Sequence, residues 1–326
     1  MPIAGEAVDQ FARWLLVAVA LDLLVTRFVV RLAIFVPKGE PYATIGAILG
    51  RIGAATDVLV PILGILLLGA LLVRAGRTGR RLEQAVLVAV TVVAFGGLAL
   101  VVYPPTPFVV TVLGVLTAAP AALAGIQIGL RPGLSATARA GLAFLALAVA
   151  AAAASRALGA LGAAFGLATW PDGVDGPALG VVGQASFVAG AGLVGLAGLH
   201  RAILTGSLRR PAAAAGAVAA LAVVVAGAGA SLTWGALSIW SLGLTGAIPV
   251  PAVALGMGLA LAGLPSLHQR APSAAVGAGI VLLAGYGLAA SGLVLASLLG
   301  LMVAACGRAE PTASGTATAT AERTGH

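Results

Sequence analysis

Residues 74–107 read RAGRTGRRLEQAVLVAVTVVAFGGLALVVYPPTP, and this stretch decides the fold. Arginines come before its apolar run, and a proline-rich turn without Lys or Arg follows the run. An apolar run of about 20 residues matches the hydrocarbon core of a bilayer, which is about 30 Å thick. Backbone groups in lipid must be satisfied within the segment, so such a run forms a helix. Basic loops stay in the cytoplasm, which places the arginine end of this helix inside the cell.

The same pattern recurs along the chain. Hydrophobic residues make up 60% of the sequence and charged residues 9%, against about 45–50% and about 25% in soluble domains. We therefore predict an all-α polytopic integral membrane protein with about nine transmembrane helices. Residues 1–306 form its single domain, and the tail 307–326 is predicted to be disordered. The predicted spans are 11–36, 57–74, 83–103, 108–130, 140–167, 178–200, 212–234, 246–264 and 274–305.

Loops with arginine alternate with loops that lack Lys and Arg. Arginines occur at 74–81, 131–139, 201–210 and 270, whereas 104–107, 168–177 and 235–245 contain no basic residue. This alternation predicts a cytoplasmic N-terminus. It also accounts for the net charge of +8, so we expect no nucleic-acid partner. The excess of Arg over Lys, with abundant Ala, Gly and Val, indicates a prokaryotic protein of the plasma membrane.

Two segments depart from the regular pattern. The connection 37–56 should be external but carries Lys38 and Arg51, and Tyr42–Ala55 is apolar enough for a short interfacial or re-entrant helix. The last run, 274–305, is long for one crossing and contains several glycines. We predict one tilted helix there with an external tail. A tight hairpin, which would make ten spans, is the alternative.

Charged residues within or beside the apolar runs are the candidate site. A charge at the bilayer centre costs roughly 2.5–3.5 kcal/mol, so these side chains should face the bundle interior and find partners. Cations outnumber anions among them, which favours an anionic ligand over a metal ion. The alternative is a set of structural ion pairs that join three spans. The predicted cluster consists of Arg27, Arg31, Asp57, Arg156 and Asp22.

The remaining polar residues suggest no chemistry. Gln127 and Gln184 are predicted to join helices by hydrogen bonds. Three dispersed histidines and one cysteine, Cys306, predict no metal site, and the chain lacks a phosphate-binding loop. We therefore expect no cofactor and no catalytic residue. An enzyme acting on lipids, using Asp172 and Asp175, is a weaker alternative, because these residues lie in a turn sequence.

These features favour a permease or exporter of small molecules, with an anionic solute attracted to Arg27 and Arg156. The alternative is a non-catalytic membrane subunit of a larger transport or respiratory complex, with the basic loop 74–81 as a docking site. The expected partners are the lipid bilayer and, under the alternative, further membrane or cytoplasmic subunits. The sequence leaves open whether the chain forms a homo-oligomer.

Overall fold

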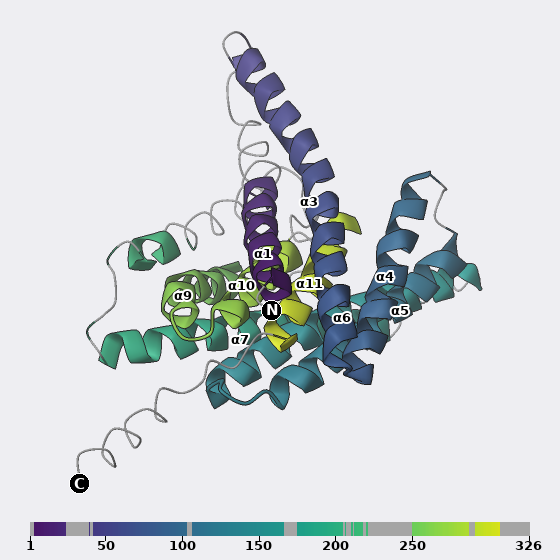
Figure 1. The fold of residues 1–326 in the computed structure, drawn as a ribbon. Coiled ribbons are helices and arrows are strands. Elements are labelled where there is room, and N and C mark those ends of the chain that lie inside the picture. Colours follow the sequence, from purple (N-terminus) through teal and green to yellow (C-terminus); the bar gives the residue numbers. More distant parts are fainter. Residues whose placement is uncertain are drawn as a thin grey trace.

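The described part of the chain is almost entirely helical (Figure 1). The computed structural model describes residues 3–23, 39, 42–102, 106–165, 175–204, 206, 210, 212–217, 220, 250–286 and 291–306. The helices are α1 (Ile3–Asp22), α3 (Tyr42–Thr78), α4 (Arg81–Val102), α5 (Pro107–Gly129), α6 (Ala136–Ala164), α7 (Asp175–Leu204), α9 (Val250–His268), α10 (Pro272–Tyr286) and α11 (Ser291–Cys306).

Local signals explain several of these bounds. Thr106 caps α5 by accepting a hydrogen bond from the Val109 amide, and Pro107 occupies the first turn, where the missing N–H costs nothing. α3 ends at Gly79, which adopts a positive φ of 65°. Its amide bonds to the carbonyl of Ala75, and glycine suits this helix-ending conformation.

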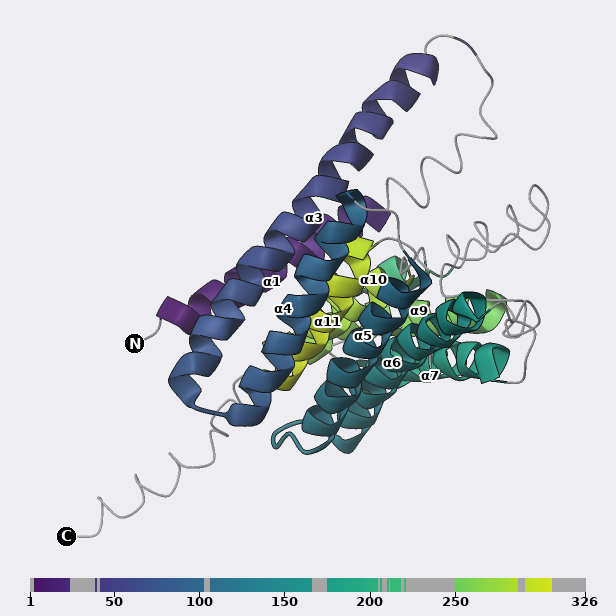
Figure 2. The same cartoon turned by 90° about the vertical axis from the view of Figure 1, so that its right-hand side faces the viewer.

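The α10–α11 hairpin forms the centre of the bundle, and the other helices surround it (Figures 1 and 2). Helices that follow one another in sequence pack side by side, from α1 and α3 through α4, α5, α6 and α7 to α9. α10 lies between α9 and α1 and contacts both, while α11 contacts α3, α4 and α5. Nearly all described side chains of the two central helices are buried, as expected for helices that are apolar on every face.

Small residues bring the two central helices together. A Cβ added to Gly300 would lie 2.9 Å from the Gly277 carbonyl oxygen, and one added to Gly277 would lie 2.8 Å from the Ala304 amide. The same device joins α11 to α3, where a Cβ on Gly64 would meet Leu295 at 3.3 Å. Without a hydrophobic force between helices in lipid, such close backbone approach is a main source of packing energy.

The prediction of one helix over 274–305 was wrong, because the structure has two helices there, of 15 and 16 residues. Their lengths are about 22 and 24 Å, short of a hydrocarbon core of about 30 Å. A helix enclosed by others has no need to cross, since protein covers its ends. The glycines of this run were the correct signal for the hairpin alternative.

The expected short helix at Tyr42–Ala55 is also corrected. It is continuous with the next predicted span, 57–74, in the 37-residue helix α3. Asp57 had been treated as a span boundary, but no Gly–Pro type turn signal separates Ala55 from Val58. α3 is about 55 Å long, and Figure 2 shows its N-terminal end projecting beyond the other helices.

Other predicted segments fall wholly or partly outside the described residues. These include the second half of span 11–36, most of span 212–234, the loop 235–245 and the tail 307–326. Among the residues that the structure does describe, four helices are long and apolar enough to cross a membrane, namely Ala43–Thr78, Pro107–Gly129, Ala136–Gly162 and Leu179–Leu204. Shorter apolar helices accompany them. The fold is compatible with an all-α membrane protein.

The close contact between α10 and α11 generates a stability prediction. Gly277→Ala should lower the melting temperature of the detergent-solubilised protein by several degrees, because overpacking typically costs about 1–3 kcal/mol. Gly69→Ala is the control, since a Cβ there meets nothing within 4 Å and alanine favours a helix. Equal melting temperatures for the two variants, measured by size-exclusion chromatography after heating, would contradict this packing.

Candidate functional site

The structure places Asp22 in a buried contact between α1 and α3. Its carboxyl group is 5% exposed, and the Thr56 hydroxyl lies 3.0 Å from Asp22 Oδ1 and 2.8 Å from the Gly53 carbonyl oxygen. Thr56 itself is 2% exposed. A buried carboxyl group needs such partners, so Asp22 joins the end of α1 to α3 whatever else it does.

The other predicted members of the charge cluster are only partly described. Arg27 and Arg31 lie outside the described residues, and so does the side chain of Asp57. Arg156 lies on α6, eight residues before the helix ends at Ala164. Its side chain is exposed on the surface of the bundle, and its predicted interior position in the membrane stays a prediction. The main neighbours of α6 are α5 and α7, whereas those of α1 are α3 and α10.

The two glutamines differ in burial. Gln184 on α7 is 2% exposed, and its neighbour Gly183 packs against the backbone of α6 near Ala148. Gln127 on α5 is half-buried. Ser186, two residues further along α7, is also buried. The helix-packing role of the two glutamines stays a prediction.

A polar cluster that we did not predict holds the base of the central hairpin. Arg131, in the turn between α5 and α6, is 7% exposed. Its guanidinium donates to the carbonyl of Ala304 in the last turn of α11 and to the Ser273 hydroxyl, 3.2 Å away, in the first turn of α10. One side chain therefore holds the beginning and the end of the hairpin. It also satisfies a C-terminal carbonyl that a helix leaves unpaired.

Further charged groups surround this base. Glu83, in the first turn of α4, is 5% exposed and lies within hydrogen-bonding range of the Cys306 thiol. Arg74 near the end of α3 is close enough to Cys306 to interact with it electrostatically. Burial lowers the pKa of the Arg131 guanidinium below its ordinary value, yet arginine remains charged in proteins. Within the described part of the chain, Glu83 Oε1 has no hydrogen-bond partner.

We call Arg74, Glu83, Arg131, Ser273 and Cys306 the hairpin anchor. Sequence reasoning missed it because Arg74 and Arg131 fit the positive-inside pattern, which explains them without any contact. The residues of the key bond, Arg131 and Ala304, are 173 positions apart in the chain. Glu83 gave a weak signal, as the acidic residue at the start of an apolar run, but nothing linked it to Cys306.

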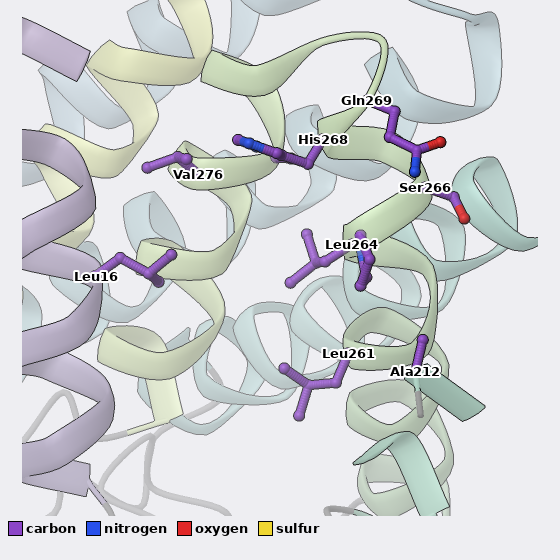
Figure 3. Close-up of a pocket in the computed structure, with 10 residues that line it drawn as sticks. Leu16, Ala212, Leu261, Leu264, Ser266, His268, Gln269 and Val276 are labelled. Atoms are coloured by element: carbon purple, nitrogen blue, oxygen red, sulfur yellow. The ribbon is translucent and has the colours of Figure 1, made fainter. Parts of the chain in front are cut away.

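A cavity of about 510 Å³ lies beside the central hairpin, where α10 separates α9 from α1 (Figure 3). Its walls are apolar side chains of the three helices. In Figure 3, Leu16 of α1 faces Leu264 of α9 across the space. His268 reaches toward Val276, while Gln269 and Ser266 lie on the other side of the end of α9. That end is the C-terminus of α9, next to the basic turn with Arg270. The cavity is therefore an apolar space with polar groups at the basic end.

In the described ranges, no group of three or more His, Cys, Asp or Glu side chains is placed to hold a metal ion. Searches of protein-family models, of curated proteins and of solved structures find no match to the chain. Function must therefore be argued from the hairpin, its anchor and the cavity.

The hairpin anchor yields a prediction about Arg131. Arg131→Met should lower the free energy of unfolding by about 1.5–3 kcal/mol, the usual worth of hydrogen bonds to a charged group. The free energy of unfolding of Arg131→Lys should lie between those of the unaltered protein and Arg131→Met. A lysine ammonium group lacks the fork of donors with which the guanidinium reaches both α10 and α11.

Unfolding by increasing SDS in mixed micelles, followed by circular dichroism, measures this effect. Arg77→Met is the matched control, since Arg77 is an exposed arginine of the neighbouring basic turn. If Arg131→Met and Arg77→Met unfold at the same SDS fraction, Arg131 does not anchor the hairpin.

Proposed function

We propose that the chain is a permease or exporter of small molecules in the plasma membrane of a prokaryotic cell, with its N-terminus in the cytoplasm. The observation that carries this proposal is the central hairpin, whose two helices are buried in the bundle but are shorter than a bilayer is thick. α10 and α11 have 15 and 16 residues, against about 20 residues for a crossing.

Both ends of the hairpin lie at one end of the bundle, because Arg131 contacts the first turn of α10 and the last turn of α11. The basic turns that contain Arg77, Arg80 and Arg139 belong to the same end, which the positive-inside bias assigns to the cytoplasm. The hairpin would then enter from the cytoplasm and stop within the hydrocarbon core. This orientation replaces our expectation of an external tail after Cys306.

A helix that stops inside a membrane leaves backbone groups that only protein or water can satisfy. Irregular backbone at membrane depth is tolerated where it is buried in protein or lines a water-filled cavity. Transporters use such interrupted helices to line their substrate sites near the bilayer midplane. The buried hairpin beside an open cavity of about 510 Å³ supports this use over a purely structural one.

The charge pattern supports an anionic solute. Arg27, Arg31 and Arg156 outnumber Asp22 and Asp57 within the predicted spans, and Asp22 already has the Thr56 hydroxyl as a partner. An arginine kept at membrane depth costs enough that it usually serves a pathway or a partner. The proposed mechanism is electrostatic attraction of the solute to these arginines, followed by rearrangement around the hairpin.

Transport can be measured in proteoliposomes loaded with a polar metabolite extract of the host, with mass spectrometry of the released solutes. We expect saturable release of an anionic solute. Arg27→Gln and Arg156→Gln should each reduce its rate about tenfold, as expected for the loss of one favourable charge interaction of roughly 1.4 kcal/mol.

Arg210→Gln is the matched control, because Arg210 is exposed in a predicted basic loop. The proposal fails if no solute leaves faster than from empty liposomes. It also fails if all three variants transport like the unaltered protein.

A second function, as a membrane subunit of a larger complex, is favoured by the projecting end of α3. This end is apolar but exposed, with Ile45 at 49% and Ile48 at 52%, and α3 is longer than a bilayer crossing needs. If this end binds another membrane subunit, a second polypeptide should co-purify in fixed stoichiometry from the native host. Its amount should fall with Ile45→Ser plus Ile48→Ser but not with Val73→Ser, an equally exposed site on the same helix.

A further inference from the structure

The cavity beside α10 is shaped and lined for an amphipathic molecule. We propose that it binds one acyl chain of a membrane phospholipid, with the head-group end of the lipid at the C-terminus of α9. The proposed transport function also draws support from this cavity, but the lipid proposal rests on the residues that line it and is tested by binding, apart from transport.

The walls of the cavity are apolar over three helices. Leu16 comes from α1, Leu261 and Leu264 from α9, and Ala275 and Val276 from α10. The volume of about 510 Å³ falls within the roughly 300–1,000 Å³ of small-molecule sites. A space of this size lined by leucine and valine suits hydrocarbon, because these side chains offer no hydrogen-bonding partner to a polar group.

Polar groups are confined to one end of the cavity. Ser266 and His268 belong to the last turn of α9 and Gln269 follows it directly, and in Figure 3 the His268 imidazole is the one that reaches toward Val276. These groups can donate hydrogen bonds to ester or phosphate oxygens. Arg270 follows directly in the sequence and is exposed, so a cation is available at the level where a lipid phosphate would lie.

The position of the cavity selects a lipid over a soluble ligand. α10 separates α1 from α9 at this point, and both outer helices contribute to the walls. The polar end coincides with the basic end of the bundle, where lipid head groups meet basic residues of membrane proteins. Hydrocarbon toward the membrane interior and hydrogen-bonding groups toward its surface match the arrangement of one phospholipid chain.

Direct binding tests the site on the full chain. The purified protein, in a detergent stripped of lipid, is titrated with dioleoyl-phosphatidylglycerol or dioleoyl-phosphatidylcholine and observed by native mass spectrometry. We expect one tightly bound phospholipid per chain, with phosphatidylglycerol the tighter because of Arg270. Leu261→Gln and His268→Ala should each weaken it about tenfold, which corresponds to roughly 1.4 kcal/mol.

Matched controls lie on the described helices. Leu255→Gln changes a leucine of the same helix α9 that is 63% exposed, and His200→Ala changes an exposed histidine at the end of α7. A second variant, Leu261→Trp, fills the cavity while keeping it apolar. Loss of lipid binding in this variant cannot be attributed to the buried polar group that could misfold Leu261→Gln.

The outcomes separate clearly. Loss of the bound lipid in Leu261→Trp and His268→Ala, with retention in both controls, supports the site. Equal binding by all variants would overturn it, and so would equal binding of a soluble anion such as inorganic phosphate at the same position. Transport can fail in either case without changing this result, because lipid binding is measured by mass alone.

Discussion

A helix that ends within lipid keeps its backbone polar groups satisfied only if other parts of the protein cover them. Under the proposed membrane location, this constraint governs the arrangement of the bundle, because α10 and α11 are too short to reach from one bilayer surface to the other. The surrounding helices enclose the pair, and glycine at Gly277 and Gly300 lets the two backbones approach within van der Waals range. The apolar surface that would otherwise need lipid is buried against helices on every side.

Packing of the surrounding helices against α10 and α11 does not by itself determine which end of the hairpin is fixed to the rest of the bundle. Arg131 fixes one end, since its guanidinium donates hydrogen bonds to both helices there. Glu83 and Arg74 lie close by. Charged side chains buried at the edge of an apolar core are costly to leave unpaired, and their pairing therefore favours one register of the chain over others. The anchor is built from elements far apart in sequence, so it can form only after the surrounding helices have assembled.

The sequence predicted the class of fold and several helix bounds because these depend on local features. The predicted spans 83–103 and 108–130 agree with α4 and α5 within two residues. The hairpin was the alternative and not the first prediction, because a run of Ala, Leu, Val and Gly has the same hydropathy whether it forms one helix or two. The anchor was missed for a different reason. The sequence around a loop arginine such as Arg131 does not show whether its side chain faces water or bonds to a carbonyl 173 residues away. Asp22, a buried polar residue within a span, was recognisable, but its partner Thr56 was not.

The anchor and the lipid cavity meet on one helix. Ser273, which accepts from Arg131, and Val276, which lines the cavity, are one turn apart on α10. A displacement of α10 along or about its axis would therefore change both the bond to Arg131 and the shape of the cavity. A bound acyl chain can favour one position of α10 only if it binds that position more tightly than another, and the leucine side chains of α1 and α9 that face the cavity provide such a difference. If the cavity holds lipid as proposed, lipid occupancy and hairpin anchoring would be linked through the first two turns of α10, at the end of the bundle where the basic turns gather.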